Sequence, residues 1–196
     1  MNWYWVVDCS NTVQHPYVST VDNSGDLGYE YWHFTIGQAI KQWDKRLWIG
    51  TTKSEYDGSP DDVLQSHFDA PIYSRQLREA LDDAYVTGIQ YLPIEVRRLN
   101  SGKIGGFSIA NILNMPPALH LELSDYDVFP NDYFFEKDRG RIRILRKAVL
   151  ISGHLRGYDI IRLKEYSVCI YASERFKTLF ETKKFTGYSF HEVKVV

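Results

Sequence analysis

The sequence contains one pattern twice: SRQLREALDDAYVTG at residues 74–88 and SERFKTLFETKKFTG at residues 173–187. The two stretches align without a gap, although only their serine, threonine and glycine positions are identical. Each opens with a serine that can accept a hydrogen bond from a free backbone N–H of a first helical turn. Apolar residues then recur at helical spacing, namely Leu77, Ala80 and Leu81 in one stretch and Phe176, Leu179 and Phe180 in the other. The pattern predicts a short amphipathic helix after Ser74 and after Ser173.

Both predicted helices are followed by Thr-Gly, at Thr87-Gly88 and Thr186-Gly187. Glycine accepts the positive φ that lets a chain turn sharply after a helix. Apolar and polar residues then alternate over 89–94 and 188–193, and a short apolar run precedes each helix. The sequence therefore predicts two strand–helix–turn–strand units.

The remaining chain favours strands. Aromatic residues make up 15% of the sequence, and their rings suit the surface of a pleated sheet. Further strands are predicted at residues 3–7, 29–34, 47–49, 119–123, 141–151 and 158–163, with a helix from Thr35 to Trp43 and a glycine-rich turn over 101–106. We expect an α+β fold with a mainly antiparallel sheet and a few short helices. We expect one domain over residues 1–196, with residues 1–100 and 101–196 as pseudo-repeated halves.

Charge is distributed unevenly, although the formal net charge is only −2. Residues 1–70 hold ten acidic and four basic residues, whereas residues 71–196 hold fifteen and nineteen. Residues 53–62, the acidic loop, combine Gly58 and Pro60 with four carboxylates, Glu55, Asp57, Asp61 and Asp62. Such a loop is either a solvated excursion or a surface that attracts a basic partner.

A basic stretch covers residues 137–147. On a strand, Arg139, Arg141 and Arg143 point the same way and form a cationic stripe. The stripe fits a solvated strand edge that resists aggregation, a surface for an acidic protein, or an RNA-binding module that uses residues 139–147. The low net charge and the lack of aromatic residues within the stretch disfavour nucleic acid.

Catalytic motifs are not recognisable. The six histidines are scattered, and the sequence lacks the spacings of a phosphate-binding loop, a zinc site or a nucleophile elbow. Two histidines lie two residues from an acid, in the pairs His120/Glu122 and His67/Asp69, so each pair shares a face if it lies on a strand. A small enzyme that uses one of these pairs is therefore an alternative, but we expect no catalytic residue, no metal and no cofactor.

The apolar run Trp3–Val7 is too short for a signal peptide and has no basic residues before it. No stretch approaches the ~20 apolar residues that cross a membrane. We expect a cytoplasmic protein that does not contact the membrane. The sequence leaves its oligomeric state open, a homodimer included.

A family resemblance enters through the C-terminal part. Residues 158–180 (YDIIRLKEYSVCIYASERFKTLF) and the following FTGYSF at 185–190 resemble the end of a bacterial immunity-protein family, formerly a domain of unknown function. The segments FSIANILN at 107–114 and ALHLELS at 118–124 are similar to the centre of that family. The resemblance covers roughly residues 107–124 and 158–193.

Members of this family are associated with polymorphic toxin systems. The resemblance implies a cytoplasmic protein that binds and neutralises a cognate toxin domain, and it implies no catalytic residues. Because charge complementarity speeds encounter and selects partners, we expect the acidic loop, with Glu55, Asp57, Asp61 and Asp62, to contact the toxin.

Overall fold

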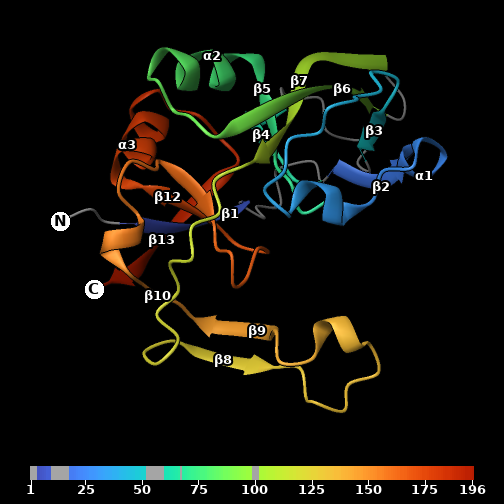
Figure 1. The fold of residues 1–196 in the computed structure, drawn as a ribbon. Coiled ribbons are helices and arrows are strands. Elements are labelled where there is room, and N and C mark those ends of the chain that lie inside the picture. Colours follow the sequence, from blue (N-terminus) through green and yellow to red (C-terminus); the bar gives the residue numbers. More distant parts are fainter. Residues whose placement is uncertain (1–3, 10–17, 52–59, 67, 99–101) are drawn as a thin grey trace.

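The computed structural model describes residues 4–9, 18–51, 60–66, 68–98 and 102–196. Strands dominate it and helices are short, so the predicted α+β class is confirmed. Two large sheets share the body of the molecule, and a two-stranded arm projects from it (Figure 1). Within the described residues, no helix has the length and apolar character needed to cross a membrane.

The first sheet has the strand order β2-β3-β6-β7-β5-β4. Its strands are β2 (Val18–Asp22), β3 (Trp48–Thr51), β4 (Val63–Leu64), β5 (Ile72–Ser74), β6 (Ile89–Arg98) and β7 (Gly102–Ile112). The second sheet has the order β10-β13-β1-β12-β11. Its strands are β1 (Tyr4–Cys9), β10 (Val149–Leu150), β11 (Ile160–Arg162), β12 (Ile170–Ser173) and β13 (Tyr188–Val195).

Five strands of the first sheet, β3-β6-β7-β5-β4, follow the order and directions of the second sheet. In each set of five the first pair, β3 with β6 or β10 with β13, is parallel, and the other pairs are antiparallel. The N-terminal strand β1 occupies in the second sheet the place that β7 has in the first. Each sheet thus includes a strand from across residue 100, and an origin of the two units by duplication stays a prediction.

The two predicted helices are α2 (Arg75–Asp83) and α3 (Glu174–Thr182). The Oγ atoms of Ser74 and Ser173 accept hydrogen bonds from the backbone N–H three residues on, at 3.1 and 3.2 Å. The apolar faces of both helices meet in one core cluster between the sheets, which contains Leu77, Leu81, Phe176 and Phe180. The helix starts and the buried stripes were therefore predicted correctly.

The turns after the helices differ from the prediction in one respect. The left-handed residue that ends each helix is Tyr85 or Lys184, the second residue after it, with φ of 55° and 59°, rather than glycine. Gly88 and Gly187 have positive φ three residues later, where each turn enters its strand. Both glycines lie against other segments: an added Cβ would be 2.0 Å from the Asn114 side chain at Gly88 and 2.2 Å from the Val63 carbonyl oxygen at Gly187.

The predictions for residues 29–43 were wrong. The expected strand contains the 3-10 helix η1 (Tyr31–Phe34), and the expected helix after Thr35 is a series of turns. Gly37 has a φ of 66°, which a helix cannot include. The backbone N–H and C=O of Ile40 bond instead to the side chain of Gln90, at 2.9 and 2.8 Å. A side chain fifty residues away thus replaces the helical hydrogen bonds.

Two further local predictions were wrong. Residues 102–106 form the first part of β7 instead of a turn. A register shift against β6 and the positive φ of Gly106 mark a β-bulge there. In the expected strand 119–123, only Leu119 pairs, with Leu150, and a turn follows. The predicted strands at 3–7, 47–49, 141–151 and 158–163 are confirmed by β1, by β3, by β9 (Ile142–Lys147) with β10, and by β11.

The remaining elements are small. They are α1 (Ser24–Leu27), β8 (Asp125–Val128) and the 3-10 helices η2 (Glu136–Asp138) and η3 (Ser152–His154). Strand β8 pairs with β9 and forms the arm (residues 125–147). The Val149 N–H donates to Ser124 Oγ at 3.0 Å, which closes the base of the arm.

Candidate functional site

The acidic loop is described only at its C-terminal end. Glu55 and Asp57 lie outside the described residues. Asp61 is 7% exposed. The Asp62 carboxylate accepts hydrogen bonds from Ser74 Oγ at 2.7 Å and from the Thr186 backbone N–H at 3.1 Å. Asp62 therefore joins the start of α2 to the turn after α3.

Asp159 makes the matching contact in the second sheet. It accepts a hydrogen bond from Ser173 Oγ at 2.8 Å, as Asp62 does from Ser74, and it pairs with Arg175. Burial alone would raise the pKa of Asp159, but the hydrogen bonds from Arg175 and Ser173 outweigh burial and lower it. Sequence reasoning assigned Asp62 to the toxin-contacting acidic loop and missed its contact with Ser74, and it missed Asp159 altogether. The only available signal was an aspartate ahead of each capping serine.

We expect Asp159→Asn to lower Tm at pH 7 by roughly 2–4 °C, the shift that about 1 kcal/mol produces at this size, since Arg175 is exposed to solvent. A folded-state pKa below the unfolded value of about 3.9 stabilises the fold above that pH. The gap to the wild type should therefore close as the pH falls through the lowered pKa of Asp159. Thermal melts across an acid pH series test this, and a gap that is constant with pH would contradict it.

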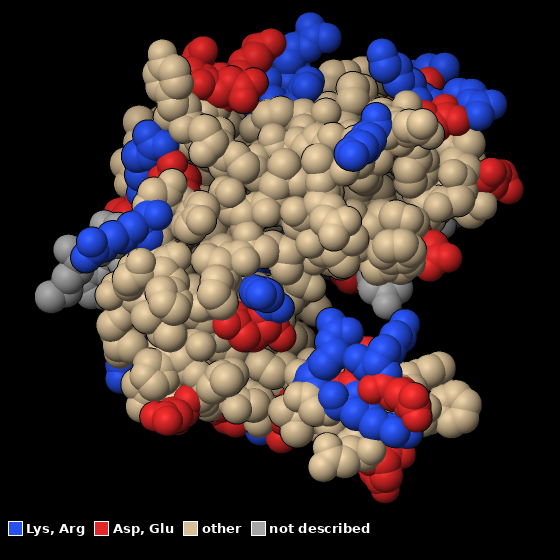
Figure 2. Space-filling view, in the orientation of Figure 1, with Lys and Arg blue, Asp and Glu red and all other residues tan. Residues whose placement is uncertain are grey.

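The arm changes the interpretation of the basic stretch. Arg139 precedes β9 instead of lying on it. Each arginine of the arm has a carboxylate within 4.0 Å: Arg139–Glu136 3.4 Å, Arg141–Asp138 3.1 Å, Arg143–Asp127 3.7 Å, Arg146–Asp125 2.8 Å and Arg146–Asp127 2.7 Å. Figure 2 shows these blue and red side chains interleaved on the arm. The expected stripe of Arg139, Arg141 and Arg143 on one strand was wrong: Arg139 and Arg141 precede β9 and pair with Glu136 and Asp138. The arginines that β9 does contain pair with aspartates of β8.

The structure describes only one of the two histidine–acid pairs in full. His67 lies outside the described residues. His120 and Glu122 do not share a strand face, because a turn begins directly after His120 and the His120 carbonyl accepts the backbone N–H of Ser124 at 3.0 Å. Among the described residues, no three His, Cys, Asp or Glu side chains lie together as a metal site.

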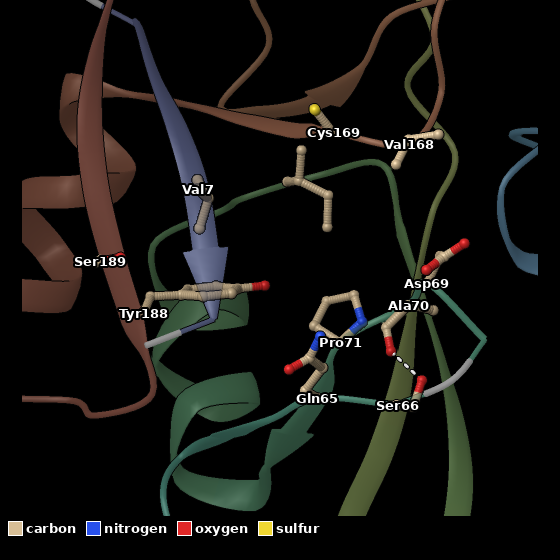
Figure 3. Close-up of a pocket in the computed structure, with 11 residues that line it drawn as sticks. Val7, Gln65, Ser66, Asp69, Ala70, Pro71, Val168, Cys169, Tyr188 and Ser189 are labelled. Carbon is tan, nitrogen blue, oxygen red and sulfur yellow. Dashed lines mark hydrogen bonds between the residues drawn. The ribbon is translucent and has the colours of Figure 1, made fainter. Parts of the chain in front are cut away.

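A cavity of about 510 Å³ lies between the two sheets. One wall is the connection from β4 to β5, with Ser66 and Asp69, and another is Val168-Cys169 before β12. In Figure 3 the Tyr188 side chain reaches from β13 toward Pro71 across this space. Ser66 Oγ donates to the Ala70 carbonyl at 2.6 Å, which shapes the first wall.

Arg162 joins the walls of this cavity and is fully buried. Its guanidinium donates to the backbone carbonyls of Asp69, Ser167 and Val168, the last at 3.0 Å. Burial lowers the pKa of Arg162, and the neighbouring Tyr188 and Asp69 oppose that effect. Its Nε has no hydrogen-bond partner within the described residues. Sequence reasoning missed Arg162, which stands inside the apolar run Ile160–Leu163.

Asp62, Asp159 and Arg162 all hold chain segments together. The two aspartates bind the capping serines, and Arg162 binds three backbone carbonyls. These contacts define a sheet-rich α+β protein from which a two-stranded arm projects.

The comparison with protein families identifies the chain more closely. It matches the Immunity protein family (Imm11) over residues 3–195, and the chain belongs to that family. The match confirms the resemblance and extends it across the first seventy residues. The search of curated proteins found no match.

Proposed function

We propose that this protein is a cytoplasmic bacterial immunity protein of a polymorphic toxin system, which binds and neutralises a cognate toxin domain without catalysis. The observation that carries the proposal is the family match over residues 3–195. Neutralisation then rests on a protein–protein interface that blocks the toxin.

Co-expression with the product of the adjacent gene tests the proposal. We expect the full chain to restore growth and to co-purify with that product as a complex of fixed stoichiometry. A non-catalytic inhibitor should abolish toxin activity only when it reaches molar equivalence, and the mass of the toxin should be unchanged. Complete neutralisation at a small fraction of equivalence would instead mean that the chain modifies the toxin, and no rescue with no co-purification would refute the immunity role.

We also propose that the acidic loop contributes to the encounter with the toxin. Asp61 is buried and Asp62 binds Ser74 and Thr186, so reversing either charge would disturb the fold itself. Glu55 and Asp57 are therefore the members of the loop whose charge can be tested at the interface.

We expect Glu55→Lys with Asp57→Lys to slow association by about tenfold at low salt and to change dissociation little, because rim charges act mainly on the encounter rate. Association kinetics at two salt concentrations measure the effect. The matched control is Glu79→Lys with Asp83→Lys on α2, two exposed acids whose reversal changes the net charge equally. Equal slowing by both pairs would assign the effect to net charge and not to the acidic loop.

A further inference from the structure

The arm concentrates exposed apolar side chains. Of the twelve large apolar side chains that are strongly exposed in the described part of the chain, four lie in the arm and two directly before it. These are Leu121, Leu123, Val128, Phe134, Phe135 and Ile144. Phe134 is the extreme case, at 83% exposed, and Phe135 beside it is 52% exposed. A monomer gains nothing from presenting neighbouring rings to water, so a cluster of this kind indicates a surface that a partner covers.

The tip of the arm is ordered by its own contacts. The Phe134 and Phe135 rings meet edge to face with centroids 5.0 Å apart, and Tyr133 packs on Phe129 at 4.5 Å. Arg139 Nε donates to the Tyr133 carbonyl at 2.8 Å. The backbone N–H of Phe129 donates to the Arg141 carbonyl at 2.9 Å, so the two sides of the tip are joined. A preorganised tip loses little conformational entropy when it binds.

The arm that carries the rings also carries exposed arginines. Residues 139–147 hold five basic residues and no acidic residue. Although their arginines pair with carboxylates of the arm, the side chains of Arg141, Arg143 and Arg146 remain about half exposed or more, at 67%, 49% and 46%. Exposed arginines and exposed aromatic rings on one surface are the composition of interface hot spots. Arg146 is occupied by Asp125 and Asp127, so the remaining donors of Arg141 and Arg143 are the ones that favour carboxylates on the opposing surface.

We propose that the arm is the main contact with the toxin domain. Phe134 and Phe135 enter an apolar pocket on the toxin, and carboxylates at the rim of that pocket bind Arg141 and Arg143. This inference rests on the proposed immunity function and adds the surface that performs it. It also separates two roles: the acidic loop acts on encounter, whereas the arm sets the lifetime of the complex.

The test is Phe134→Ala with Phe135→Ala in the full chain, measured against the co-expressed product of the adjacent gene. Because hot-spot rings dominate binding free energy, we expect Kd to rise on the order of 100-fold, mainly through faster dissociation. We expect Tm to change little, since both side chains are exposed. Arg141→Ala with Arg143→Ala should weaken binding by a smaller factor and reduce its dependence on salt.

Tyr85→Ala is the matched control. Tyr85 is 84% exposed at the end of α2, so this change removes an equally exposed ring from another surface. We expect it to leave Kd within about twofold. If the wild type binds and the Phe134/Phe135 double variant binds equally well, the arm assignment is wrong while the immunity function stands. If the wild type does not bind, both fail.

A second copy of the chain is the competing occupant of the tip. Light scattering of the wild type and of the double variant distinguishes it. A wild-type dimer that the double variant converts to a monomer, with toxin binding unchanged, would overturn the proposal and assign the tip to self-association.

Discussion

Gly187→Ala is expected to destabilise the protein by about 3 kcal/mol or more, through overpacking added to backbone strain. Gly187 has a φ of 102°, a conformation that residues with a Cβ rarely adopt. The new Cβ would be 2.2 Å from the Val63 carbonyl oxygen and 3.0 Å from its carbonyl carbon. These are backbone atoms, so no rotamer change can relieve the overlap.

The neighbouring segment cannot move away at small cost either. The Val63 backbone N–H donates to the Thr186 carbonyl at 3.0 Å, and Asp62 next to it binds both Ser74 and Thr186. Displacing β4 would therefore break the link between the first sheet and the turn after α3. The steric clash at Gly187 and the hydrogen bonds of Asp62 and Val63 involve the same segment. Gly187 is therefore the more sensitive of the two glycines that end the Thr-Gly turns.

Urea denaturation of Gly187→Ala and of a control, Gly105→Ala, measures the effect. Gly105 lies in β7, and an added Cβ there meets nothing within 4 Å, so we expect a change of about 0.5 kcal/mol or less. Gly88→Ala should fall between the two, because its Cβ meets the side chain of Asn114 and not backbone, and moving that side chain costs its hydrogen bonds to the Thr87 and Ile160 carbonyls. Equal stability of the Gly187 and Gly105 variants would show that the turn after α3 does not need glycine.

The helices were predictable because their signals are local. Ser74 and Ser173 stand three residues from the N–H groups that they cap, and the buried stripe repeats within nine residues. The predicted helix after Thr35 had the same apolar spacing, but it contains Gly37 and its Ile40 backbone binds Gln90. Apolar spacing with Thr35 as a plausible cap was not sufficient there, because the Thr35 hydroxyl donates to the Trp32 carbonyl instead. The placement of β1 in the second sheet depends on contacts more than 150 residues apart in sequence, which no local pattern encodes.

The same contrast between local patterns and long-range contacts applies to the charged surfaces. The acidic loop and the basic stretch were visible as charge patterns, but the partners of their charges were not. Asp62 is occupied by Ser74 and Thr186, and Arg146 by two aspartates of β8. Whether a charge is available to a partner depends on which strand lies opposite, so the sequence predicted where charge gathers and not where it is free. The family, by contrast, was predictable, because its resemblance rests on contiguous residues around α3.

Arg162 is the second site where a large effect is expected. Its side chain is fully buried and extends from β11 to carbonyls on two loops, at Asp69 and at Ser167-Val168. Arginine can make these contacts because its guanidinium presents five donors in a fixed fork. The carbonyls belong to both walls of the cavity between the sheets, so Arg162 links the first sheet to the second.

Arg162→Ala is expected to cost about 3–5 kcal/mol, because it leaves a cavity and also removes the donors of three backbone carbonyls. Arg162→Met separates these causes. Methionine restores most of the volume but none of the hydrogen bonds, so we expect it to remain at least about 2 kcal/mol below the wild type. Chemical denaturation of the three proteins gives both differences. If Arg162→Met were as stable as the wild type, packing alone would explain the burial of Arg162, and the link between the sheets would not depend on its guanidinium.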